Sequence, residues 1–153
     1  MLDKLPRVAI ESFTGVSNVS IIADIPVGTT VLDLGCGAGL DSLIAALRTG
    51  PDGKVIGVDF SESMISRARQ AFKMSGFDNG EFRIADAENL PVEDNSIDVA
   101  LVNGIFNLSP DRGAVFLHLA RVLKDDGSVY AAELILNGSE PQSTQCDLTN
   151  WFA

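Results

Sequence analysis

The chain has 153 residues, 46% of them hydrophobic, which suffices for one domain with a packed core and is too short for two. Its 21 acidic and 11 basic residues give a net charge of −10, which opposes binding to nucleic acid or to an anionic membrane. The two cysteines, Cys36 and Cys146, are too few for a disulfide framework or a thiolate metal site, so we expect free thiols and no metal centre.

Residues 1–28 show weak periodicity and lack the uninterrupted apolar core of a signal peptide. They contain a small-residue turn at 13–18 and an apolar helical segment at 19–25, which Pro26 ends. No later stretch approaches the length of a membrane span. The sequence therefore predicts a cytoplasmic protein.

A buried strand at 30–34 leads into three glycines at alternate positions, Gly35, Gly37 and Gly39. Glycine permits positive φ and a close approach of the backbone to a ligand. The helix expected at 40–49 carries its apolar residues at core-facing spacing. These residues are Leu40, Leu43, Ile44 and Leu47. Strand, glycine turn and helix N-terminus together predict a ligand cradle.

Asp33 and the glycine spacing limit the kind of ligand. A dinucleotide fingerprint needs its third glycine at position 40, where this chain has Leu40, and the Asp33 carboxylate would repel a pyrophosphate. A P-loop is also excluded, because no Gly-Lys-Ser/Thr follows. A cationic ligand suits Asp33 better. The alternative is a glycine-rich turn that binds nothing.

The remainder of the chain alternates strands and helices. Strands are expected at 54–58, 81–85, 97–102 and 128–135, and helices at 63–74 and about 111–123. Ser61 or Ser63 can cap the first of these helices, and Lys124-Asp-Asp-Gly127 is expected to end the second. This order predicts an α/β fold with a doubly wound, mostly parallel sheet. We divide the chain into an N-terminal cap segment (1–28), a core (29–136) and a tail (137–153).

Polar residues follow four of these strands at the edge where such sheets bind ligands. They are Asp33, Asp59, Asp86 and Asn103. Asp59 lies about two dozen residues beyond the first glycine and can accept hydrogen bonds from vicinal ribose hydroxyls, unless it merely caps the following helix.

Two further positions near these strand ends could contact a purine. Phe60 and Met64 could pack on its face, although Met64 could equally belong to the core. Asp86, with the backbone of Ala87, could read an adenine edge, and the alternative is a solvated acidic turn. Lone His118 falls inside a predicted helix, away from every strand end, and is interpreted as structural.

Residues from about 13 to 129 resemble the class I S-adenosylmethionine-dependent methyltransferases, specifically the methyltransferase type 11 or arsenite methyltransferase-like subgroup. The segments that carry the resemblance are 31–42, 57–64, 87–91, 95–98, 107–111 and 121–124. The resemblance implies a Rossmann-like fold with S-adenosylmethionine as cofactor and S-adenosylhomocysteine as product. Asp33, Gly35 and Gly37 would line the methionine moiety.

The same resemblance assigns Asp59 to the ribose, and Asp86 and Ala87 to adenine. The full predicted cofactor-binding set is Asp33, Gly35, Cys36, Gly37, Gly39, Asp59, Phe60, Met64, Asp86, Ala87, Asn103 and Gly104. Asn103 and Asn107 match the segment beside the methionine and the acceptor, and are the expected positioning residues. Gly15 and Asn18 match an N-terminal loop that covers the ligand.

The implied reaction is in-line methyl transfer to a small-molecule acceptor, which needs positioning more than acid–base help. No catalytic residue is identified. The chain has no Asn/Asp-Pro-Pro-Phe/Tyr motif, so amide and exocyclic-amine acceptors have no positive support. Arsenite bound by several thiolates is disfavoured, because there are only two cysteines. The acceptor stays open.

The chain ends soon after the fifth strand, whereas the family normally adds strands six and seven beside it. These two strands are expected to be missing, which would leave the strand at 128–135 as an edge. A longer parent protein, a second copy forming a homodimer, or another chain could cover it. The rival function is a catalytically incomplete domain that binds cofactor or a protein partner without turnover. A nicotinamide oxidoreductase is a distant third.

Overall fold

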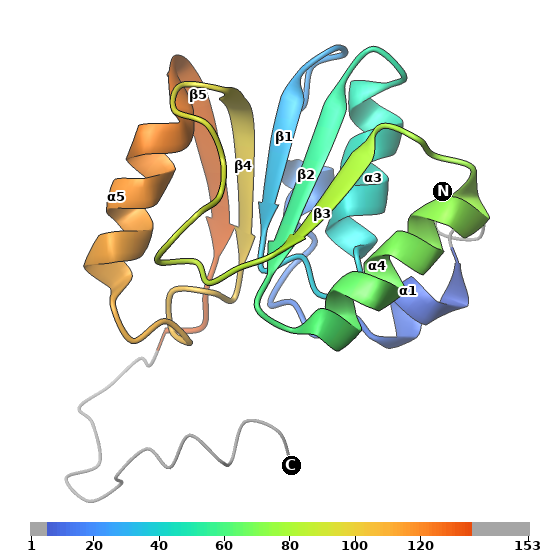
Figure 1. Ribbon diagram of the computed structural model, residues 1–153, viewed down its shortest axis with the longest axis horizontal. Coiled ribbons are helices and arrows are strands. Elements are labelled where there is room, and N and C mark those ends of the chain that lie inside the picture. The colour runs from blue at the N-terminus through green and yellow to red at the C-terminus, as the bar shows by residue number, and fades with distance from the viewer. Residues whose placement is uncertain (1–5, 136–153) are drawn as a thin grey trace, which may run out of the picture.

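The computed structural model describes residues 6–135 and contains one parallel sheet with helices on both faces (Figure 1). Its elements in chain order are α1 (Arg7–Glu11), α2 (Val19–Ile22), β1 (Thr30–Leu34), α3 (Leu40–Thr49), β2 (Lys54–Asp59), α4 (Glu62–Ser75), β3 (Gly80–Ile84), β4 (Ile97–Asn103), α5 (Arg112–Val122) and β5 (Leu123–Ala132). The strand order is β3-β2-β1-β4-β5, and every neighbouring pair is parallel. The predicted α/β, doubly wound fold is confirmed.

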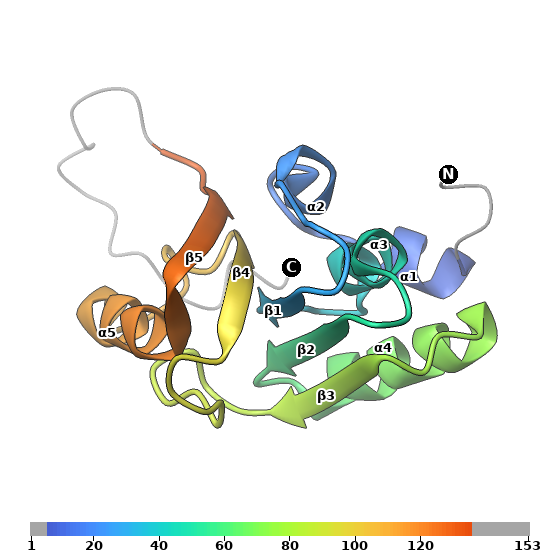
Figure 2. The same ribbon diagram turned by 90° about the horizontal axis from the view of Figure 1, so that it is seen from above.

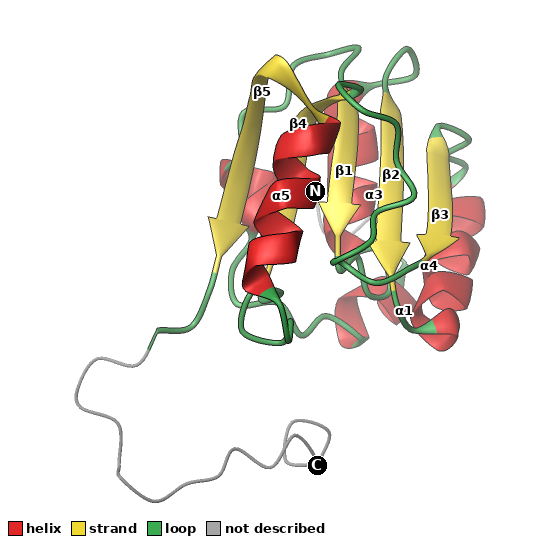
Figure 3. Ribbon diagram, turned by 60° about the vertical axis from the view of Figure 1, so that its left-hand side comes forward, coloured by secondary structure: helices red, strands yellow, loops and turns green. Residues whose placement is uncertain are grey.

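The strands run in one direction, so their carboxyl ends meet at one edge of the sheet (Figure 3). Strand β1 is central, with β2 and β3 on one side of it and β4 and β5 on the other. A parallel sheet of this kind binds ligands beside its central strand, where the order reverses. The residues that follow β1 therefore occupy the expected ligand position.

The core has two layers, one on each face of the sheet (Figure 2). On the face covered by α1 to α4, Leu43 and Ile65 pack against strand residues such as Val31. On the other face, Val115 and Leu119 of α5 complete a separate cluster. Alternate residues of β1, β2 and β4 supply the two layers, which explains why these three central strands are mostly apolar.

A loop at 85–96 takes the place of a helix between β3 and β4. Its residues Leu90 and Val92 are buried on the α5 face. Arg121 of α5 donates to both of their carbonyl oxygens at 2.8 Å, and Leu90 N donates to Nδ1 of His118 at 3.4 Å. His118 therefore holds this loop, which agrees with a structural role, and the loop carries Asp86 to the carboxyl edge.

The N-terminal segment differs from the sequence-based expectation. Helix α1 was not predicted, and α2 has four residues where seven were expected. Pro26 ends the apolar stretch as expected, but Ala23 is already extended, at ψ 145°. Leu47, in the last turn of α3, is 48% exposed, so the buried stripe ends one turn earlier than its spacing predicts.

The fifth strand also begins and ends earlier than predicted. Leu123 already pairs with Ile97, and Ser128 pairs with Val99, so residues 124–127 form an irregularity within the strand instead of a helix stop. Lys124 is held there because its Nζ donates to Oδ1 of Asp98 at 2.7 Å. The strand ends at Ala132, because the next two residues bond the loop after β4.

Within the described residues β5 forms one edge of the sheet, as predicted. Val129 on this strand is 42% exposed. The predictions about residues 137–153, including Cys146, lie outside the described residues, and the division into cap, core and tail stays a prediction. No helix in the described part of the chain has the length and apolar character to span a membrane.

Candidate functional site

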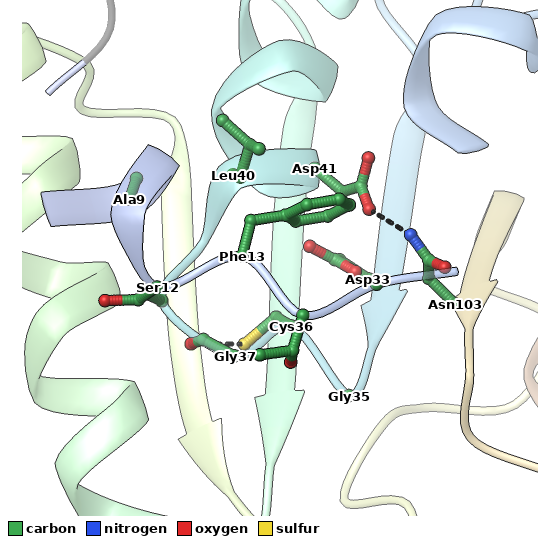
Figure 4. A pocket seen from close by; sticks show the side chains of 13 residues that line it. Ala9, Ser12, Phe13, Asp33, Gly35, Cys36, Gly37, Leu40, Asp41 and Asn103 are labelled. Atoms are coloured by element: carbon green, nitrogen blue, oxygen red, sulfur yellow. Dashed lines mark hydrogen bonds between the residues drawn. The ribbon is translucent and has the colours of Figure 1, made fainter. Parts of the chain in front are cut away.

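Two cavities flank the glycine turn after β1 at the carboxyl edge of the sheet. The first is the strap cavity, named after the segment 12–20, the strap, whose residues 12–15 line it; its space, part of which is open to solvent, is about 380 Å³ (Figure 4). The second, the loop cavity, lies beside the loops after β3 and β4, and its space, also partly open to solvent, is about 540 Å³. Gly35 lines both cavities, so a single ligand of extended shape can reach from one to the other.

Most of the predicted site residues line these cavities. The strap cavity is lined by Asp33, Gly35, Cys36, Gly37 and Asn103 from the predicted set. The loop cavity is lined by Gly35, Asp59, Phe60, Asp86 and Ala87. Residues that the sequence placed far apart are therefore brought together at one edge, as expected for the ends of parallel strands.

Four predicted residues line neither cavity. Met64 is half-buried on α4, and Gly104 donates its backbone N–H to the carbonyl oxygen of Ala132 at 2.9 Å. Asn107 donates to the carbonyl oxygen of Leu134 at 2.6 Å. The fourth is Gly39. A contact of any of the four with a ligand stays a prediction.

Gly35 and Gly37 shape the turn in different ways. Both have positive φ, which favours glycine. A Cβ on Gly35 would lie 1.9 Å from Cδ1 of Ile105, so the backbone passes directly under that side chain. A Cβ on Gly37 would meet nothing within 4 Å. The space over Gly37 is open to a ligand that contacts the backbone closely.

Gly39 has a packing role. It precedes α3 with φ +85°, and a Cβ there would lie 3.0 Å from Cβ of Ala68 on α4. We expect Gly39→Ala to destabilise the fold by about 2 kcal/mol or more, from unfavourable φ plus overpacking. Thermal unfolding measures this. Gly76→Ala is the matched control, because Gly76 has φ +72° but open space around it. Equal losses from the two variants would contradict the packing role.

Asp59 ties the glycine turn to the start of α4. Its Oδ2 accepts from Gly37 N at 2.9 Å, and its Oδ1 accepts from Ser61 N at 2.8 Å. Ser61 is the N-cap of α4, because its Oγ accepts from Met64 N at 3.4 Å. Asp59 is therefore not needed as the helix cap. Each of its oxygens retains a lone pair for a ligand hydroxyl.

Asp33 lies beneath the strap cavity and is only 2% exposed. Burial, and next the nearby Asp41 carboxylate, raise the pKa of Asp33 to about 8, although Ser42 Oγ donates to it at 2.5 Å. Asp33 is thus mostly neutral at pH 7 without a ligand, and a cation beside it would favour its ionised form. Burial likewise raises the pKa of the Cys36 thiol well above its usual value.

Asn103 connects β4 to the strap instead of pointing freely into the cavity. Its Oδ1 accepts from Val16 N at 2.8 Å and from Ser17 N at 3.3 Å. Its Nδ2 donates to the Ser17 carbonyl at 2.6 Å and to Oδ2 of Asp41 at 2.9 Å. A Cβ on Gly15 would lie 2.4 Å from this Nδ2, so the strap needs glycine there. Asn18 is the N-cap of α2 without a side-chain bond.

Sequence reasoning missed several residues of the site. Asp41 lines the strap cavity. Glu88, which belongs to the acidic turn of Asp86 but was left out of the predicted set, lines the loop cavity and accepts a hydrogen bond from Ser109 Oγ. Ile105 covers Gly35. The sequence did contain an indication of Asp41. It lies two residues after Gly39, in the first turn of α3, where an acidic side chain is close to the helix N-terminus.

The chemistry of the lining is acidic. In the described part of the chain neither cavity is lined by lysine, arginine or histidine, whereas four aspartates and a glutamate line them. These residues are Asp33, Asp41, Asp59, Asp86 and Glu88. Such a lining suits a ligand with a cationic group and hydroxyl donors, and disfavours a pyrophosphate.

Comparisons with known proteins agree with this geometry. A family model described as a methyltransferase domain matches residues 25–151. The arsenite methyltransferase of Halobacterium salinarum is 41% identical over 133 residues, which cover 87% of this chain and 34% of that protein. The demethylmenaquinone methyltransferase of Lactococcus lactis is 39% identical over 106 residues, which cover 69% of this chain and 42% of that protein.

A solved structure has a similar fold. The crystal structure of an arsenic(III) S-adenosylmethionine methyltransferase from Chlamydomonas reinhardtii matches with a TM-score of 0.79 at 32% identity. The match covers 86% of this chain and 46% of that one. The chain therefore spans between one third and one half of the length of these three proteins.

Proposed function

Because the chain belongs to the methyltransferase domain family, we propose that its two cavities together bind S-adenosylmethionine and that the whole protein methylates a small-molecule acceptor. The membership agrees with the class I methyltransferase resemblance of the sequence. The proposal rests on the two cavities, which have acidic linings and share Gly35 of the glycine turn. They lie at the point of the sheet where the strand order reverses.

The residues present fit this cofactor. The open space above Gly37 accepts a ligand against the backbone, and the buried Asp33 supplies a counter-charge for a sulfonium or an ammonium group. Asp59 would accept from the ribose hydroxyls. Phe60 is 64% exposed at the loop cavity and would cover the adenine, whose edge would face Asp86 and Ala87.

S-adenosylmethionine, when bound, supplies a methyl group on a positively charged sulfur. The contribution of this chain would be to orient that group and to exclude water. The strap covers one side of the strap cavity, and Ile105 lines the loop cavity and packs over Gly35. Positioning of this kind accelerates a transfer without an acid or a base, so a catalytic proton carrier is not needed.

The acceptor would enter beside the strap cavity. Two acceptor classes are suggested by the names of the relatives, arsenite and a quinone precursor. A thiolate arsenite site has weak support in the described residues, since Cys36 is buried and its raised pKa keeps the thiol neutral. We therefore propose an oxygen or carbon acceptor ahead of arsenite. Methylation assays with arsenite and with a quinol, run in parallel, would separate them.

Calorimetric titration tests the cofactor. We expect S-adenosylmethionine and S-adenosylhomocysteine to bind with a stoichiometry of one, and NAD not to bind, because its pyrophosphate would meet Asp33 and Asp59. A folded sample that binds neither S-adenosyl compound would overturn the proposal. Binding of NAD alone would favour the oxidoreductase.

A second candidate function is a domain that binds the cofactor without turnover. The observation in its favour is that β5 is a sheet edge among the described residues. Tight cofactor binding with no methylation in a panel of thiol, hydroxyl and metalloid acceptors would support it. Methylation of any acceptor would exclude it.

We also propose that the β5 edge pairs with a second copy of the chain. An edge strand offers unpaired backbone groups, and Val129 adds exposed apolar surface. Light scattering would give the mass of a dimer, and a monomer at high concentration would contradict the pairing. A cytoplasmic location stays a prediction from the sequence.

A further inference from the structure

We propose that Asp41 and Asn103 form a buckle that holds the strap closed over the strap cavity, and that Asp41 is thereby a positioning residue for the ligand. The identity of that ligand rests on the proposed function. The buckle itself is a property of the ligand-free chain, so it can be tested without any ligand.

The hydrogen-bonding capacity of the Asn103 side chain is fully used. A carboxamide has two N–H donors and a carbonyl oxygen with two lone pairs. The donors bond the Ser17 carbonyl and Asp41, and the oxygen accepts from Val16 N and Ser17 N. Asn103 therefore cannot form a hydrogen bond with a ligand unless one of its bonds to the strap or to Asp41 breaks. Its function in the closed form is to anchor the strap.

Asp41 supplies the other half of the buckle from the first turn of α3 (Figure 4). Its Oδ2 accepts from Asn103, while its Oδ1 accepts from Ser20 N at 3.2 Å and from Ser20 Oγ. Both oxygens act as acceptors, and Asp41 is only 6% exposed. An asparagine of the same shape has one acceptor oxygen and could satisfy only one side.

The buckle holds the strap directly after the part that lines the cavity, residues 12–15. These four residues have contacts of their own, because Arg67 donates to Ser12 Oγ at 3.2 Å and Phe13 packs against the core. Beyond the buckle, Arg48 donates to the Ser20 carbonyl at 2.7 Å and secures the start of α2. Release of Val16 and Ser17 would therefore free the wall of the cavity at its Gly15 end.

Amide hydrogen exchange of the ligand-free protein tests the buckle. We expect Asp41→Asn to raise the exchange rates of the Val16 and Ser17 amides about tenfold or more, the effect of losing one hydrogen bond to a charged group. Asp52→Asn is the matched control. Asp52 is exposed before β2, at the opposite end of the sheet, so its replacement should leave both rates unchanged.

Swapping the side chains at positions 41 and 103 gives a more specific test by amide hydrogen exchange. Asn103→Asp alone would place two carboxylates together and should also speed exchange at Val16 and Ser17. In the double variant Asp41→Asn/Asn103→Asp, the new amide at 41 can donate to the new carboxylate at 103, which still accepts from both strap amides but no longer donates to the Ser17 carbonyl. We therefore expect slower exchange than in Asn103→Asp alone, where two carboxylates face each other. A general structural loss would instead make the double variant the worst of the three.

Gly15→Ala breaks the buckle from the strap side without altering a buried charge, since its Cβ would press on Asn103 Nδ2. This substitution should raise the exchange rates of the Val16 and Ser17 amides. It replaces Asp41→Asn as the test if that variant does not fold. Unchanged exchange in Gly15→Ala, or a double variant no slower than Asn103→Asp alone, would overturn the buckle.

Ligand affinity tests the positioning role separately. We expect S-adenosylhomocysteine to bind about tenfold more weakly to Asp41→Asn, and to bind the double variant more tightly than Asn103→Asp alone. Faster exchange with unchanged affinity would overturn the positioning role. If the unaltered chain binds no S-adenosyl compound, the proposed function and the positioning role both fail, while the exchange rates still decide the buckle.

Discussion

Replacement of Asp33 by asparagine is expected to stabilise the ligand-free fold and, at the same time, to weaken S-adenosylmethionine binding by about tenfold to a hundredfold. The two effects have one cause. Asp33 is 2% exposed, and burial together with the Asp41 carboxylate raises its pKa from 3.8 to about 8. Ionised Asp33 is thus costly in the empty protein and useful beside a cation.

The pH dependence follows from the raised pKa. The folded state binds the Asp33 proton more tightly than the unfolded chain does, so this stability is fully present below about pH 3.8. It is lost progressively as the pH rises through the folded pKa of about 8. Asparagine mimics the neutral acid and can still accept from Ser42 Oγ. The gain in unfolding temperature should therefore be small at pH 5 and largest near pH 9.

Thermal unfolding between pH 5 and pH 9 measures the gain. Each pKa unit corresponds to about 1.4 kcal/mol, so the fully buried Asp33 should give a rise of at least about 5 °C above pH 8. Asp52→Asn again serves as control, because it removes one exposed carboxylate from the far end of the sheet. If the Asp33→Asn variant and the unaltered chain unfolded at the same temperature at pH 9, ionisation of the buried Asp33 carboxyl would not lower the stability of the fold, and the prediction would be wrong.

Binding should show the complementary trend. A cation pairs with ionised Asp33, so loading the site at pH 7 must displace a proton. The affinity of the unaltered chain should then rise with pH up to about pH 8 and level off, whereas that of Asp33→Asn should stay flat. Calorimetry in two buffers of different ionisation enthalpy would report the released proton directly.

The sheet could be predicted from the sequence because parallel strands buried on both faces are continuous apolar runs. The run ending at Leu34 shows β1 to the residue, and the start of β4 at Ile97 is equally clear. Asp33, Asp59 and Asn103 were found for the same reason, since each ends a recognisable strand. Topology then brings them to one edge, whatever lies between them in the chain.

The resemblance at Gly15 and Asn18 implied a loop that covers the ligand, but the path of the strap and the buckle could not be predicted, because nothing local in the sequence encodes them. The bond from Val16 N to Asn103 joins residues 87 positions apart, and residues 12–18 have no periodicity that would indicate their path. Asn103 was found as a strand end but its role was not, since only the structure shows which groups use its amide. The early start of β5 was missed because Lys124-Asp-Asp-Gly127 has the composition of a helix stop.

Asp59→Ala is expected to weaken cofactor binding by about tenfold or more, the effect of losing charge-assisted hydrogen bonds. The substitution would also leave Gly37 N and Ser61 N without their acceptor, so the glycine turn should loosen. Ser61→Ala is the matched control. It removes the N-cap of α4, which costs about 1 kcal/mol of stability, but keeps the carboxylate. Comparable binding losses from both would show that fraying of α4 is the cause.

5′-Methylthioadenosine separates the two aspartates, because it keeps the ribose and adenine but has neither the ammonium nor the sulfonium charge. Asp59→Ala should weaken its binding as much as that of S-adenosylmethionine, since the ribose hydroxyls are common to both. Asp33→Asn should leave its binding nearly unchanged, since Asp33 lines only the strap cavity and acts on positive charge. If both variants lost the same affinity for 5′-methylthioadenosine, the loop cavity would not bind the adenosine part separately from the charged part of the ligand. The assignment of the loop cavity to adenosine would then be wrong.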